Sequence, residues 1–132
     1  MLKRDFIMVQ IEELGKVIAQ MIFNRNANDG ARKNPGMVQT VYSSLKLDRD
    51  TLLTASPEEL RQMLDGDDFC GLQRLEIAVK TFIEESYLLP DWQTTILPKA
   101  KTILEYLQAN DNTFSLERIA LIGDIEARLK ML

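Results

Sequence analysis

Apolar residues recur at helical spacing along most of this chain. The first run consists of Ile7, Ile11, Leu14, Ile18 and Met21, at intervals of four, three, four and three residues. This is the a/d stripe of an amphipathic helix over two heptads. Similar stripes predict helices over 5–25, 35–46, 57–64, 71–88, 91–108 and 115–131. No segment alternates apolar and polar residues as a half-buried strand does. The sequence therefore predicts an all-α fold of about six amphipathic helices in antiparallel hairpins.

Several helix boundaries have recognisable signals. Ser56-Pro57-Glu58-Glu59 is a capping box with proline in the first turn, and Ser115 is placed to cap the last helix. Asn34-Pro35 supplies an N-cap followed by proline. Pro98 leaves two alternatives, because proline is tolerated only in a helix's first turn. Either the fifth helix begins near residues 94–95, or a helix from Asp91 is kinked; we favour the first.

The segment from Asn24 to Gly36 is rich in Asn, Asp, Gly and Pro, which favours a mobile loop. Gly15 lies inside the first helix, where glycine costs about 1 kcal/mol relative to alanine. A residue this small would let another helix approach closely. The length of 132 residues fits a single helical domain over 1–132.

Charge and hydropathy exclude some classes of partner. The net charge is −4, so the chain lacks the basic surface that binds nucleic acid or anionic membranes. Its apolar runs are too short to span a bilayer. The N-terminus has no secretory leader pattern. We therefore expect no nucleic-acid or membrane partner and a cytoplasmic location.

The residues needed for common catalytic and metal sites are missing. The chain has 0 His and 1 Cys, so the usual zinc ligands and the usual base for a Ser or Cys nucleophile are lacking. Asp65-Gly66-Asp67-Asp68 resembles the start of a calcium loop, but Cys70 stands where that loop needs glycine. The adjacent pairs Glu12-Glu13, Glu58-Glu59 and Glu84-Glu85 are interpreted as solvated, and Cys70 as a buried thiol. We predict no catalytic residues, no cofactor and no metal.

Six residues are candidates for binding a partner. Tyr87, Trp92 and Tyr106 flank the proline-containing turn between the fourth and fifth predicted helices, and Tyr and Trp are enriched at interface hot spots. Arg25, Arg32 and Lys33 give the segment 24–36 a small positive patch that would suit an acidic partner.

Both ends of the chain resemble a family of small bacterial proteins of unknown function. The resemblance lies in Asp5-Phe6-Ile7-Met8 with Ile11-Glu12-Glu13-Leu14, in Leu104-Glu105-Tyr106-Leu107, and in Thr113 to Arg118. It implies a helical, tetratricopeptide-like arrangement and brings no activity with it.

These observations predict a non-enzymatic helical module that binds a protein or peptide, or that self-associates through the helix at 5–25. The alternative is a small-ligand-binding protein or enzyme with a carboxylate-lined pocket among the helices at 71–88, 91–108 and 115–131. A third interpretation is a regulatory subunit whose loop at 24–36 becomes ordered on a partner.

Overall fold

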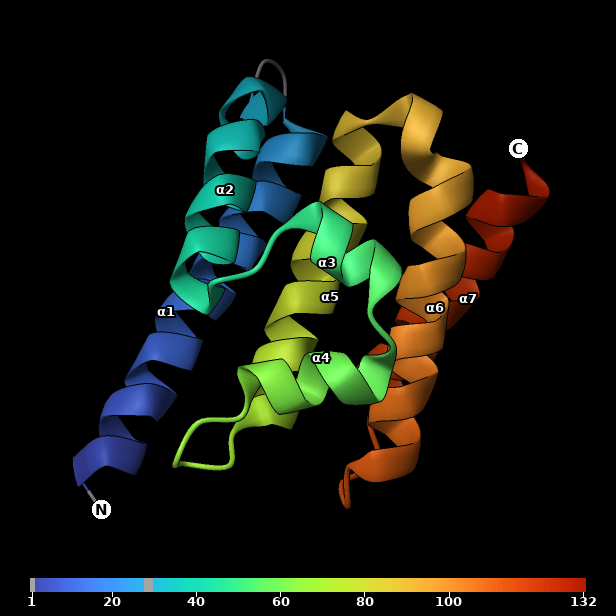
Figure 1. The fold of residues 1–132 in the computed structure, drawn as a ribbon. Helices are drawn as coiled ribbons and strands as arrows, with labels where there is room; N and C mark the ends of the chain where they lie inside the picture. The colour runs from blue at the N-terminus through green and yellow to red at the C-terminus, as the bar shows by residue number, and fades with distance from the viewer. Residues whose placement is uncertain (1, 28–29) are drawn as a thin grey trace.

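The computed structural model describes residues 2–27 and 30–132, with side chains from Met8 onward within those ranges. The helices are α1 (Leu2–Asn26), α2 (Asn34–Leu45), α3 (Arg49–Thr54), α4 (Pro57–Leu64), α5 (Gly71–Leu88), α6 (Gln93–Asn110) and α7 (Leu116–Lys130), with short 3₁₀ turns η1 (Gly30–Lys33) and η2 (Pro90–Trp92). No strand occurs in these ranges, so the predicted all-α fold is confirmed (Figure 1). None of the described helices is long and apolar enough to cross a membrane.

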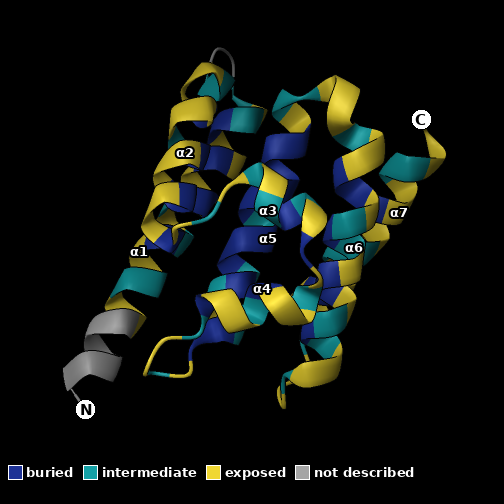
Figure 2. Ribbon diagram, in the orientation of Figure 1, coloured by how far each residue is buried: buried dark blue, intermediate teal, exposed yellow. Residues whose placement is uncertain are grey.

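Helix α5 is the centre of the bundle. It packs against α1, α2, α4 and α6, and 11 of its 18 residues are buried. Figure 2 shows this burial along most of its length. A helix surrounded by others must be apolar on nearly every face. Leu75, Val79 and Phe82 are accordingly fully buried, and Thr81 bonds its own helix through the Ile77 carbonyl at 2.9 Å.

The predicted helix starts at Ser56 and Ser115 are confirmed. The Ser56 hydroxyl accepts from the Glu59 amide and the Glu59 carboxylate accepts from the Ser56 amide, both at 3.1 Å. Ser115 caps α7 through the Arg118 amide. Helix α3 was not predicted, because its six residues are too few to show a periodic stripe. Asp48 caps it at the Thr51 amide, and Leu52 anchors it in the core.

The segment 24–36 differs from the predicted loop. Helix α1 continues to Asn26, η1 follows at Gly30, and Asn34 is the first residue of α2 rather than its N-cap. The predicted mobility of this loop stays a prediction, and residues 28–29 lie outside the described ranges. Two of the asparagines that suggested a loop are buried instead: Asn24 donates to the Asn34 side chain at 3.1 Å, and Asn34 donates to the Met21 carbonyl at 3.0 Å.

The start of α6 also differs from the favoured interpretation. The helix begins at Gln93, directly after η2, so Pro98 is its sixth residue and lies inside the helix. The structure therefore matches neither predicted alternative, a proline in the first turn or a helix that begins at Asp91. The 3₁₀ turn at Pro90 reverses the chain, so that α5, α6 and α7 run antiparallel in sequence (Figure 1).

The acidic segment 65–68 forms hydrogen bonds with the first turn of α5. Asp65 accepts from the Gly71 amide at 2.7 Å, and Asp68 accepts two hydrogen bonds from the Arg74 guanidinium at 2.9 and 2.8 Å. These bonds lower the pKa of Asp68. Cys70 is buried, as predicted.

Candidate functional site

The predicted stripe on α1 is part of the protein's own core. Leu14, Ile18 and Met21 are buried in it, and Ile11 packs against it, while the side chain of Ile7 lies outside the described residues. The surface expected to pair with another copy is therefore occupied by α5 and its neighbours.

A second apolar stripe on α1 is not covered by any helix that the structure describes. It contains Met8, Gly15, Ala19 and Ile22, at intervals of seven, four and three residues, which lie on one face of a helix. Met8 and Ile22 are each 41% exposed. From Met8 to Ile22 the stripe is about 21 Å long at 1.5 Å per residue.

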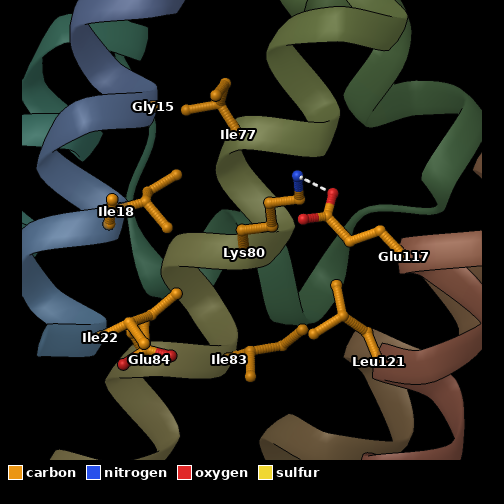
Figure 3. A pocket seen from close by; sticks show the side chains of 10 residues that line it. Gly15, Ile18, Ile22, Ile77, Lys80, Ile83, Glu84, Glu117 and Leu121 are labelled. Atoms are coloured by element: carbon orange, nitrogen blue, oxygen red, sulfur yellow. Dashed lines mark hydrogen bonds and ion pairs between the residues drawn. The ribbon is translucent and has the colours of Figure 1, made fainter.

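Gly15, Ala19 and Ile22 of this stripe, with Ile18, form one wall of a groove of about 190 Å³, and Met8 lies outside that lining. Figure 3 shows α1 on one side, α7 on the other and α5 as the floor. The lining is mostly apolar and comprises Gly15, Ile18, Ala19, Ile22, Ile77, Lys80, Ile83, Glu84, Glu117 and Leu121. One ion pair crosses from floor to wall, where Lys80 Nζ lies 2.5 Å from Glu117 Oε1.

A cluster of charged side chains on Tyr87 joins the three helices beside the groove. Arg25 of α1 holds the groove-lining Glu84 with two hydrogen bonds, Nε–Oε1 at 2.9 Å and Nη2–Oε2 at 3.2 Å. The Arg25 guanidinium lies 4.0 Å from the centre of the Tyr87 ring, and that of Arg128 lies 3.7 Å from it. These residues come from the C-terminal turns of α1, α5 and α7, which all end at the same side of the molecule (Figure 1).

The two arginines of this cluster differ in their partners. Burial alone would lower the pKa of Arg25, but the hydrogen bonds and charge of Glu84 raise it overall. Burial lowers the pKa of Arg128 and the charge of Arg25 adds to that effect, while Tyr87 and the charge of Glu84 act against it. Both Nη atoms of Arg128 are buried and have no hydrogen-bond partner among the described residues. Arg128 is thus held chiefly by its stacking on Tyr87.

The adjacent carboxylates of α5 are buried, so the prediction that Glu84-Glu85 is solvated is wrong. Glu85 faces away from the groove: it accepts from the Tyr42 hydroxyl at 2.8 Å and from Arg49 Nε at 3.2 Å. Burial, followed by the charge of Glu85, raises the pKa of Tyr42. Successive residues of a helix point about 100° apart, so each carboxylate reaches an arginine on a different helix. Glu12-Glu13 and Glu58-Glu59 are exposed, as predicted.

A carboxylate-lined hollow does lie beside α5 and α7, but it measures only about 50 Å³. Its Arg118 is buried and bonds Glu76 at 2.9 and 3.0 Å and Asp111 at 2.6 Å. Ligand pockets are usually about 300 Å³ or larger. The arrangement is that of a satisfied ion-pair network joining α5 to the α6–α7 turn.

The candidate partner-binding residues are spread over the molecule. The structure brings Arg25 and Tyr87 together beside the groove. Trp92 lies at the other side of α5's end, 5.1 Å from the Arg49 guanidinium. Tyr106 follows Trp92 by fourteen residues and lies in α6, beside Arg61 of α4.

Arg32 and Lys33 are exposed on η1. Arg128 was not among the predicted partner-binding residues. Its position in the sequence indicated its place, because it follows the groove-lining Leu121 by seven residues and so lies on the same face of α7.

A comparison with models of protein families, with curated proteins and with solved structures found no match to this chain. The resemblance to a small bacterial family and the tetratricopeptide-like arrangement therefore stay predictions.

Proposed function

We propose that this chain is a non-enzymatic interaction module whose groove between α1 and α7 binds an amphipathic helix of another protein. The observation that carries the proposal is an apolar groove with an uncovered helical stripe along one wall. Helix-in-groove recognition uses apolar anchors spaced three, four and seven residues apart. The stripe on α1 is about four helical turns long, which suits a partner helix of about 15 residues.

Gly15 supports this proposal because nothing in the described part of the chain requires a glycine there. No described glycine has a positive φ angle. A Cβ atom built on Gly15 would have no described atom from outside its own helix backbone within 4 Å. Glycine in a helix interior costs about 1 kcal/mol relative to alanine, and Ala19, one turn later on the same stripe, is also small. Small residues at a helix contact let the two backbones approach closely, so an outside helix would explain both.

The test uses helical peptides of about 15 residues, selected from a displayed library of amphipathic sequences for binding to the wild-type protein. Gly15→Trp would place an indole in the groove, and we expect it to weaken binding at least tenfold in fluorescence anisotropy. Gly123→Trp is the matched control, because Gly123 is also a helix-interior glycine with open space around it but does not line the groove. Equal binding to both variants would overturn the proposal.

A further inference from the structure

Arg128 has no counter-charge of its own in the cluster beside the groove. Both oxygens of Glu84 accept hydrogen bonds from Arg25. Asp124, one turn before Arg128, is exposed; its charge raises the pKa of Arg25, but it forms no ion pair with either arginine among the described residues. The side chains in contact on Tyr87 therefore carry two guanidinium charges and one carboxylate.

This arrangement is costly without a hydrogen-bonding partner. A buried polar group that lacks hydrogen bonds destabilises the fold, and a charged group does so more. Stacking on Tyr87 and the negative ends of the helix dipoles of α1, α5 and α7 offset part of that cost. Neither satisfies the Nη atoms of Arg128, whereas a carboxylate binds a guanidinium through two parallel hydrogen bonds.

The cluster continues the groove rather than lying apart from it. Arg25 follows the groove-lining Ile22 by three residues on α1, and Tyr87 follows Glu84 by three residues on α5. Arg128 follows Leu121 by seven residues on α7. These intervals keep each residue on the groove face of its helix. A helix lying in the groove would therefore place one of its ends against Tyr87 and the two arginines.

We infer that the partner is an amphipathic helix carrying an aspartate or glutamate at that end, and that its carboxylate binds Arg128. On binding, the Arg128 side chain turns on its flexible stem from the Tyr87 ring toward the carboxylate. The inference rests on the proposed function, since it names the chemistry of the helix that the groove receives.

The test compares matched peptides on matched proteins. From the peptides selected on the groove, those that bind best should carry an acidic residue near one end. Replacing that residue by Gln should weaken binding to the wild-type protein roughly tenfold, the effect of losing one charge-assisted pair. On the Arg128→Gln variant, the acidic and Gln peptides should bind within about twofold of each other. Lys130→Gln is the control, because it removes the same charge from an exposed position on α7 and should keep the tenfold preference.

The outcomes separate this inference from the proposed function. If Gly15→Trp blocks the peptides but the acidic and Gln forms bind the wild type equally, the inference is wrong and the groove proposal stands. Peptides that are insensitive to Gly15→Trp would overturn both. Sedimentation that shows a dimer abolished by Gly15→Trp would make the occupant a second copy and would overturn the inferred partner.

Discussion

At the scale of single residues, the buried carboxylates of α5 are the clearest case of what a sequence pattern does not reveal. Glu84 and Glu85 look like any adjacent acidic pair on a helix surface. Their burial depends on Arg25, which precedes Glu84 by 59 residues, and on Tyr42 and Arg49, which precede Glu85 by 43 and 36. Local periodicity carries no information about partners so distant in the chain. Cys70, by contrast, has a residue type whose usual environment predicts its burial.

Glu85→Gln should destabilise the protein by about 2–3 kcal/mol, because it removes a charge-assisted hydrogen bond and leaves the Arg49 charge without its carboxylate. The free energy of unfolding from urea denaturation measures the effect. Glu105→Gln, at an exposed site on α6, should change that free energy by less than about 0.5 kcal/mol. Similar values for the two variants would mean that the Glu85 contacts contribute nothing.

At the scale of elements, the helix boundaries that were predicted correctly depend on residues close together in the sequence. The Ser56–Glu59 capping box and the Ser115 cap act within four residues, so the pattern and the structure agree. The predicted loop at 24–36 was wrong because its conformation depends on contacts between separate helices. Asn24 and Asn34 have the composition of a turn, yet their side chains bond each other across the α1–α2 hairpin. Tertiary packing overrode the preference of asparagine for turns and helix caps.

The three glycines 15, 30 and 123 should respond differently to alanine. Gly15→Ala and Gly123→Ala should each stabilise the protein by about 0.5–1 kcal/mol, since both sites are helical and have open space for a Cβ atom. Gly30→Ala should destabilise it, because the new Cβ would lie 2.8 Å from the Asn24 carbonyl oxygen. Thermal unfolding of the three variants gives the ranking. A loss of stability in Gly15→Ala would show that the groove wall is already packed.

At the scale of the whole molecule, the groove arises from chain topology. Helices α1 and α7 come from opposite ends of the described chain and become its two walls because α6 brings α7 back alongside α5 (Figure 1). The sequence predicted α1 and α7 as amphipathic helices and placed Gly15 inside the first of them. The sequence did not predict that α1 and α7 face each other across α5, since that arrangement depends on which helices pack together. The number and type of the long helices were predictable, while the site was predictable only in fragments, namely Gly15, Arg25 and Tyr87.

The same topology predicts uneven local stability. Helix α7 buries only Arg118 and Ile125, whereas α5 buries 11 residues. Backbone amides in a helix with few buried contacts open more often. Hydrogen exchange followed by mass spectrometry should show faster exchange in α7 than in α5. Uniform protection of the two helices would contradict the expectation, and a bound groove peptide should slow exchange in α7 and α1 together.

The stacking of Arg49 on Trp92 provides an optical reporter that needs no label. The chain has one tryptophan, so all of its indole emission comes from this ring in η2, the turn that follows α5. Arg49 belongs to α3 and also holds Glu85. Detachment of that short helix from the bundle would therefore change the ring's surroundings and shift its emission.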